Sequence, residues 1–432
     1  DPKPLWIPDA RRIETARISH YRQWVSSKYG LSLRDNDELW AWSIGDLDTF
    51  WDSIWAYFDI AGTRGSGPAL AQARMPGAVW FPGSTLNYAA QALRHGPGEQ
   101  TAIVATDETG ELREVSWDAL REQVASFAAT LRSRGIQPGD RVAALLPNTA
   151  ETVVAFLGCA AVGAIWSLCS PDMGAASVLD RFRQITPKVL IASASYRYGG
   201  KTHSRGEVIG EILNTLSSSL ELFVQVPGPE ESVINTSIAS ISWGQATANS
   251  APLMIDQVAF DHPLWIVYSS GTTGLPKPIV HGHGGVTLEM LKVLALHNDL
   301  NAGERFHWYT TTGWIMWNCQ VGGLLLGATI CLYDGNPSWP EPGMLWQFAE
   351  RTGLHFLGAG AAYHTGCMKA GVRIDGASLA RTLRTVGSTG SPLSADAYQW
   401  LQEALGSSVW IAPISGGTDL ASAFIAGDCT RP

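Results

Sequence analysis

A run of glycines and hydroxyl-bearing residues follows an apolar segment and ends at one lysine: YSSGTTGLPKPIVHGHGG, residues 268–285. Glycine lets the backbone approach a ligand closely, hydroxyls donate hydrogen bonds, and lysine supplies a compact positive charge. These residue types in one loop predict the binding of a mobile polyphosphate, such as a departing pyrophosphate. The residues concerned are Ser269, Ser270, Gly271, Thr272, Thr273, Gly274 and Lys277.

The spacing differs from that of the commonest phosphate loop. That loop needs glycine directly before its lysine and a magnesium-binding hydroxyl directly after it. Here Pro276 precedes Lys277 and Pro278 follows it. The sequence therefore disfavours a P-loop NTPase or kinase. An incidental surface loop is the weaker alternative for a run this specific.

Three further runs follow in the order expected of one enzyme family. The opening run resembles the phosphate loop of the adenylate-forming family, which includes acyl-CoA synthetases, luciferases and peptide-synthetase adenylation domains. RTVGSTGSPLS (384–394) resembles that family's adenine-binding loop, and ISGGTD (414–419) resembles its threonine–acid motif. YTTTGWIMWN (309–318) is similar to the helix and turn that line the acyl pocket.

This resemblance implies roles for particular residues. It implies that Thr418 faces the α-phosphate of ATP and that Asp419, where the family usually has glutamate, coordinates Mg²⁺. Together with Lys277 these two residues form the expected catalytic set. The implied nucleotide-binding residues outside the phosphate loop are Gly390, Ser391, Pro392, Gly417, Thr418 and Asp419. The implied acyl-pocket residues are Trp314, Ile315, Met316 and Gly416.

The flanking runs LWIPDARR, MPGAVWFPGSTLNYA and YDGNPSWP narrow the resemblance to a branch close to acetyl-CoA synthetase. It implies that ATP activates a short 3-oxo acid, acetoacetate, as an acyl-adenylate that coenzyme A then attacks. Acetate-specific relatives carry tryptophan where Gly416 stands, so a glycine there is expected to enlarge the pocket. Gly416 serving only a tight turn is the alternative. A ligase for another short acid, such as acetate or propionate, and a nucleotide-binding fragment without net turnover also stay open.

Composition bounds the class of protein. With 432 residues, 45% hydrophobic and 16% charged, the chain predicts a globular protein of two or three domains or subdomains. The net charge of -9 argues against a nucleic-acid-binding surface. Six cysteines without a CxxC pair predict reduced, buried thiols. The longest apolar stretch, 321–333, is too short to span a bilayer. We therefore expect a cytoplasmic protein with small-molecule partners and no membrane insertion, and the oligomeric state stays open.

Apolar strands alternate with amphipathic helices from residue 101 onward. This pattern predicts an α/β fold with mainly parallel sheets, in which loops at the carboxyl ends of strands face one site. The expected division is a helical cap segment (1–95), a first α/β subdomain (96–260) and a second one with the AMP-binding motifs (261–432). The resemblance implies the large N-terminal domain of the adenylate-forming fold, with the C-terminal barrel part and the small mobile domain absent.

Several residues favour a structural role over a chemical one. Apolar side chains from Leu47 to Phe58 recur on one helical face and predict a core-packing helix capped by Ser43 or Asp46. His281 and His283 form an HxH without an evident third ligand, so we expect a turn residue and a packing residue. His364 is expected to be a core histidine. Packing by Trp317 and substrate contact by Trp317 are equally favoured.

Overall fold

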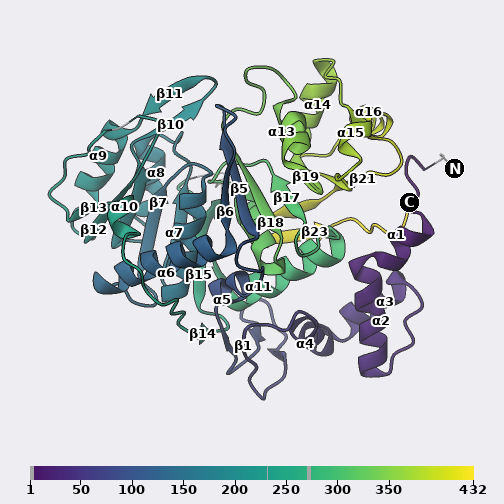
Figure 1. Cartoon of the computed structure of the whole chain (residues 1–432). Coiled ribbons are helices and arrows are strands. Elements are labelled where there is room, and N and C mark those ends of the chain that lie inside the picture. The colour runs from purple at the N-terminus through teal and green to yellow at the C-terminus, as the bar shows by residue number, and fades with distance from the viewer. Residues whose placement is uncertain (1–3, 231, 270–273) are drawn as a thin grey trace.

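Two seven-stranded sheets form the centre of the protein (Figure 1). The computed structural model describes residues 4–230, 232–269 and 274–432. Both sheets are mainly parallel, as the alternation of apolar strands and helices predicts. Within the described residues, no helix combines the length and apolarity needed to cross a bilayer.

The first sheet has the order β13-β12-β9-β7-β8-β15-β16, and only its edge strand β16 runs antiparallel to its neighbour. Its strands are β7 Arg141–Leu145, β8 Ile165–Cys169, β9 Val189–Ser193, β12 Leu222–Val226, β13 Ser240–Ser242, β15 Pro263–Ser269 and β16 Lys277–Gly282. The helices between them are α6 Trp117–Ser133, α7 Ala150–Val162, α8 Ala175–Phe182, α9 Gly206–Thr215 and α10 Trp243–Ala246. The stretch 226–252 is rich in Pro, Ser, Gly and Asn, which is typical of a loop or a connection between subdomains, but it contains β13 and α10.

The second sheet has the order β21-β20-β19-β17-β18-β5-β6, with only β6 antiparallel to its neighbour. Its strands are β5 Thr101–Asp107, β6 Arg113–Ser116, β17 Arg305–Trp308, β18 Thr329–Asp334, β19 Phe356–Gly360, β20 Thr385–Thr389 and β21 Trp410–Pro413. Its helical elements are α11 His283–Lys292, the π-helix η1 Val293–His297, α12 Ile315–Gly322, the 3₁₀-helix η2 Gly323–Leu326, α13 Met344–Thr352, α14 Ala361–Lys369, α15 Gly376–Leu379 and α16 Ala395–Leu405.

The two sheets are interleaved in the sequence. Strands β5 and β6 precede the whole first sheet in the chain but belong to the second, where Ile103 pairs with Ile330. Strands β15 and β16 follow residue 260 but complete the first sheet. The expected boundary between 96–260 and 261–432 therefore differs from the division between the sheets. Strand pairing over such separations leaves no local signal in the sequence.

A helical segment precedes the sheets and lies beside the end of the described chain (Figure 1). Its helices are α1 Ala10–Thr15, α2 Arg17–Tyr29, α3 Asn36–Gly45 and α4 Leu47–Tyr57, followed by α5 Tyr88–Leu93. The carboxylate of Asp46 caps α4 by accepting from the backbone N–H of Thr49 at 3.0 Å. Ile54 and Trp55 are buried as the stripe predicts, whereas Leu47 is exposed.

Short strands complete the structure. These are β1 Gly62–Thr63, β2 Leu70–Gln72, β3 Val79–Trp80, β4 Thr85–Leu86, β10 Ser195–Tyr198, β11 Lys201–Ser204, β14 Val258–Ala259, β22 Ser415–Gly417 and β23 Ser422–Ile425. The last two form an antiparallel hairpin that carries the threonine–acid motif in its turn.

The core is continuous between the sheets. The Phe156 ring on α7 lies 6.1 Å from Trp166, 5.9 Å from Trp265 and 5.8 Å from Trp317, measured between ring centroids. These tryptophans come from β8, β15 and α12, so one aromatic cluster joins the first sheet to a helix packed near the second. All six cysteines are buried and unpaired, as expected.

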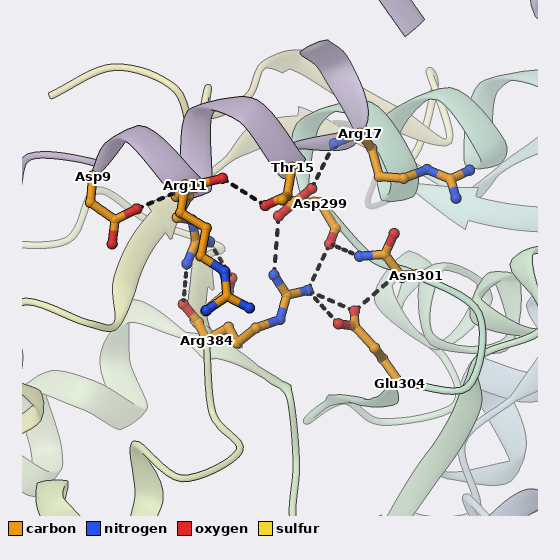
Figure 2. A network of polar contacts seen from close by, with 10 residues as sticks. Asp9, Arg11, Thr15, Arg17, Asp299, Asn301, Glu304 and Arg384 are labelled. Carbon is orange, nitrogen blue, oxygen red and sulfur yellow. Dashed lines mark hydrogen bonds and ion pairs between the residues drawn. The ribbon is translucent and has the colours of Figure 1, made fainter. Parts of the chain in front are cut away.

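A polar network fastens the N-terminal helices to the second sheet (Figure 2). The guanidinium of Arg384 bonds the Asp299 carboxylate at 3.1 Å and the Glu304 carboxylate at 2.6 Å. The backbone N–H of Arg17, at the start of α2, donates to the other Asp299 oxygen at 2.9 Å. Arg12 on α1 reaches the Arg384 carbonyl at 3.3 Å. Residues 12–17 are thereby held against segment 299–304.

Candidate active site

The phosphate loop is a hairpin connection at the edge of the first sheet. Strands β15 and β16 pair so that Ser269 lies opposite Lys277. Pro278 lacks an N–H donor and is tolerated because β16 is an edge strand. The Lys277 side chain is exposed, and a Cβ added to Gly274 would meet no atom of the described residues within 4 Å. The expected residues Ser270, Gly271, Thr272 and Thr273 lie outside the described residues.

The adenine-type loop follows the buried strand β20. Gly390 has a φ of +85°, which an L side chain rarely adopts. A Cβ added there would lie 3.7 Å from the Trp314 ring, so this loop and the acyl-type turn are in contact. Ser391 and Pro392 are exposed. The sequence motif at 384–394 and the motif at 309–318 therefore meet in space.

The threonine–acid motif forms the turn between β22 and β23. Thr418 is half-buried and the Asp419 side chain is exposed. The backbone carbonyl of Asp419 lies 3.0 Å from Nε2 of His281 on β16. Nδ1 of His281 accepts from Nε1–H of Trp265 at 2.9 Å, so the proton of the neutral imidazole is on Nε2 and is donated to Asp419. Burial lowers the pKa of His281, which favours this neutral form.

A cavity lies between these loops and helices α11, η1 and α12. Its volume is ≈ 270 Å³. All four residues expected in the acyl pocket line it, as do Gly390, Gly417 and Thr418 from the nucleotide motifs. Its lining residues are Met290, Val293, Asn298, Trp314, Ile315, Met316, Cys319, Thr389, Gly390, Ile414, Gly416, Gly417, Thr418, Ala421, Ser422 and Ala423.

Gly416 borders the cavity but is constrained by its own hairpin. A Cβ added to Gly416 would overlap the backbone carbonyl oxygen of Ser422 and lie 2.9 Å from Cα of Ala423. A side chain at this position would therefore start toward strand β23. The close approach of β22 and β23 requires glycine here, whatever its effect on pocket size. At Gly417, by contrast, a Cβ would meet no atom of the described residues within 4 Å.

Sequence reasoning missed Asn298 in this cavity. Asn298 directly follows η1 and is 2% exposed. Neither Oδ1 nor Nδ2 of its side chain has a hydrogen-bond partner among the described residues. In the sequence it ends an apolar helical run, where asparagine is an ordinary helix terminator. No local signal distinguishes an asparagine that turns into a cavity from one that caps a helix.

Other histidines and Trp317 have structural roles. His283 accepts from the backbone N–H of Tyr88 at 3.1 Å, and burial lowers its pKa to about 3. His364 is buried, and its Nε2 lies 3.1 Å from the Gly387 carbonyl oxygen. Within the described chain, it forms no hydrogen bond with a residue that lines the cavity. Trp317 donates to Oδ1 of Asn148 at 3.1 Å and is fully buried. Both ring nitrogens of His281 are hydrogen-bonded, to Trp265 on β15 and to the Asp419 carbonyl, so this side chain links two strands and the acid motif.

The Asp419 carboxylate fits a magnesium ion shared with phosphates. Among the described residues, no three His, Cys, Asp or Glu side chains gather closely enough to hold a metal by themselves. Magnesium, however, keeps several waters and is commonly bound by one or two carboxylates together with substrate phosphates. An exposed carboxylate beside a phosphate loop matches that mode.

Comparisons with known proteins agree with this geometry. The sequence profile of the AMP-binding enzyme family matches residues 89–423, and that of the acetyl-coenzyme A synthetase N-terminus matches residues 36–92. The chain belongs to the AMP-binding enzyme family. The match to the AMP-binding family spans both sheets and all four motifs of the chain.

Within this family, the chain is similar to several proteins with the same name. The chain is 37% identical over 432 residues to acetoacetyl-coenzyme A synthetase of Rhizobium meliloti (strain 1021), covering 100% of this chain and 66% of the relative. It is 37% identical to acetoacetyl-CoA synthetase of Mus musculus, covering 99% of this chain and 65% of the relative. The solved acetoacetyl-CoA synthetase from Streptomyces lividans superimposes with a TM-score of 0.95 at 46% identity, covering 100% of this chain and 67% of that one. The chain spans about two thirds of the length of these relatives.

Proposed function

We propose that the protein containing this chain is an AMP-forming ligase that joins acetoacetate to coenzyme A. A carboxylate oxygen of acetoacetate attacks the α-phosphorus of ATP, and pyrophosphate leaves with the electrons of the broken bond. The thiolate of coenzyme A then attacks the carbonyl carbon of the acyl-adenylate, and AMP leaves. The products are acetoacetyl-CoA, AMP and pyrophosphate.

One observation carries this proposal. The identity to proteins named acetoacetyl-CoA synthetase extends over the whole chain, including the helical segment that precedes the general AMP-binding match. A likeness confined to the nucleotide motifs would support only the wider family, because those motifs serve many acids.

The proposed roles follow the geometry of the three loops. Lys277, with the hydroxyls and glycines of 269–274, binds the β- and γ-phosphates and the leaving pyrophosphate. The loop at Gly390, Ser391 and Pro392 receives the adenine, and Gly417 with Thr418 faces the α-phosphate. Preorganised donors and a fixed cation stabilise the negative charge that develops as pyrophosphate departs. When bound by Asp419, Mg²⁺ supplies further charge neutralisation at the phosphates.

The cavity supplies the acyl site. Trp314, Ile315, Met316 and Gly416 wall it, and its volume of ≈ 270 Å³ leaves space beyond a methyl group. The Gly390–Trp314 contact brings the wall of this cavity to the adenine-type loop. A short acid in the cavity therefore has its carboxylate near the place where Thr418 meets the α-phosphate. Free, buried cysteines fit a cytoplasmic location.

The test is acid-dependent exchange of labelled pyrophosphate into ATP, followed by thioester formation. We use the whole protein containing residues 1–432 and compare acetoacetate with acetate, propionate and no acid. Exchange that is at least about tenfold faster with acetoacetate is expected, because pocket shape alone commonly discriminates short acids by that factor. Faster exchange with acetate or propionate would assign another short acid. MgATP binding without exchange for any acid would make this a nucleotide-binding protein without turnover.

A further inference from the structure

Asn298 is the only lining residue of the described cavity whose side chain is a fully buried, unpartnered amide. It is 2% exposed, and both of its polar side-chain atoms lack partners among the described residues. Buried polar groups in folded proteins almost always have a hydrogen-bond partner, so an amide without one is unfavourable unless a ligand satisfies it. A polar atom of a bound molecule in the cavity would supply that partner.

The surroundings of Asn298 define the chemistry of that atom. Met290, Val293 and Cys319 line the same cavity and are apolar or nearly so. No lysine, arginine, aspartate or glutamate of the described chain lines it. A charged group placed there would lose hydration without gaining a countercharge. The site therefore suits a neutral hydrogen-bonding group on an otherwise apolar chain, such as a ketone oxygen.

The backbone on both sides of Asn298 is fixed. Its N–H donates to the Val293 carbonyl at 3.0 Å and ends the π-helix. The next residue, Asp299, has a φ of +54° and accepts from Arg384 through both its carboxylate, at 3.1 Å, and its backbone carbonyl, at 2.9 Å (Figure 2). The N–H of Arg17 and Nδ2 of Asn301 bond Asp299 as well. These contacts fix the backbone position from which the Asn298 side chain extends.

We propose that Nδ2–H of Asn298 donates a hydrogen bond to the 3-oxo oxygen of the acyl substrate. Asn298 is thus a specificity-determining residue that selects a 3-oxo acid over the unsubstituted acid of the same length. Asp299, held by Arg384, positions it. This assignment rests on the proposed acetoacetate ligase function. It adds the residue that recognises the ketone through a hydrogen bond.

The first test needs no variant. Butyrate has the carbon chain of acetoacetate without the ketone, so it leaves the amide of Asn298 unpaired. In pyrophosphate exchange by the whole protein, kcat/KM for acetoacetate should exceed that for butyrate by at least about 10²-fold, because sites built to bond a polar group strongly reject analogues that lack it. A protein that activates both acids equally well overturns the role of Asn298 but leaves the ligase function standing. A protein inactive with acetoacetate overturns both.

The second test removes the amide. Asn298→Leu, and Asn298→Ala in case leucine does not fit, should lower kcat/KM for acetoacetate about 10²-fold and leave butyrate unchanged or improved. Met290→Leu, an apolar wall change, should affect both acids alike, and Asn214→Leu on the exposed face of α9 should affect neither. A merely structural asparagine would make the two acids fall together. Such a parallel fall, in variants that melt at the parent's temperature, overturns the proposal.

Discussion

Nε2 of His281 donates a hydrogen bond to the backbone carbonyl of Asp419 over 3.0 Å, across 138 residues of sequence. His281 stands on β16, the strand that begins at Lys277. One strand therefore carries Lys277 and holds the turn that contains Asp419. We therefore predict that His281 acts as a positioning residue for the Asp419 turn.

His281→Ala should loosen the Asp419 turn without unfolding the protein. One neutral hydrogen bond contributes on the order of 1 kcal/mol, so the KM for MgATP in pyrophosphate exchange should rise about fivefold. His20→Ala, at an exposed position on α2, is the matched control and should leave the KM unchanged. An unaltered KM in His281→Ala would mean that the turn holds its position without this bond.

Lys277→Ala should weaken MgATP binding or slow adenylation, with the fold intact. A charge-assisted contact to phosphate contributes about 2 kcal/mol, which corresponds to roughly a 30-fold loss. The measurement is exchange of pyrophosphate into ATP by the whole protein, beside Lys369→Ala at the exposed end of α14. Equal exchange rates in parent and Lys277→Ala would remove this lysine from the phosphate site.

Gly416→Ala should damage the hairpin and not act as a selective filter. Because the added Cβ overlaps the Ser422 carbonyl, β22 and β23 must separate, and the whole acid motif moves with them. Exchange rates should fall with acetoacetate and acetate alike, whereas Gly210→Ala on α9, which adds its Cβ where no described atom lies within 4 Å, should change them little. A variant Gly416→Ala that loses acetoacetate activity alone would show that pocket size dominates at this position.

The elements of the fold were predictable because their signals are local. The amphipathic run at 116–136 contains α6, Trp117–Ser133, with Ser116 as its N-cap, and the apolar run at 187–193 contains the fully buried strand β9. Strand order was not predictable, because the pairing of β5 with β18 joins segments more than 200 residues apart through contacts that any apolar strand could make.

The candidate site, too, was predictable from the sequence only in part. Loops after strands were expected to face one ligand, and Trp314 does contact the loop at Gly390. The roles of His281 and Asn298 depend on neighbours that come from other elements. An asparagine without partners has the same sequence signature as one that caps a helix. The residue types in the motifs predicted the kind of chemistry. Only the three-dimensional arrangement shows which of these residues contact one another.

Asp334→Asn should stabilise the protein at high pH only. Burial raises the pKa of the Asp334 carboxyl to about 7, opposed by the N–H of Asn148 and assisted by the charges of Asp107 and Glu108. Below pH of about 4 both folded and unfolded forms are protonated, and the carboxyl's contribution is fully present. As pH rises to 7 the unfolded form ionises first, so that contribution is lost.

The measurement for Asp334→Asn is chemical unfolding at two pH values. At pH about 8 the variant should be more stable than the parent by on the order of 1 kcal/mol, and at pH about 4 the two should match. Asp261→Asn, at an exposed position, should have the same stability as the parent at both pH values. A stability difference that is the same at both pH values would assign the effect to packing and not to ionisation.

Arg384→Ala should lower stability more than a surface arginine does. The Asp299 side chain is 5% exposed and would keep its charge without its main partner. We expect a loss of about 2 kcal/mol, below the value for a fully buried pair because the Arg384 side chain is 33% exposed. The loss of stability is measured by unfolding Arg384→Ala in guanidinium chloride. The control is Arg381→Ala, three residues earlier and exposed. Equal midpoints for the two variants would contradict the importance of this network.

The contacts of the N-terminal helices also set an order of assembly during synthesis. Asn36 bonds the Asp428 carboxylate at 2.8 Å, and Asp37 pairs with Arg431 at 2.8 Å. A ribosome completes α3 long before it supplies these partners, which follow nearly 400 residues later in the chain. These two contacts of α3 therefore form late, after the strands of both sheets have been synthesised, and this end of α3 stays open to chaperones until then.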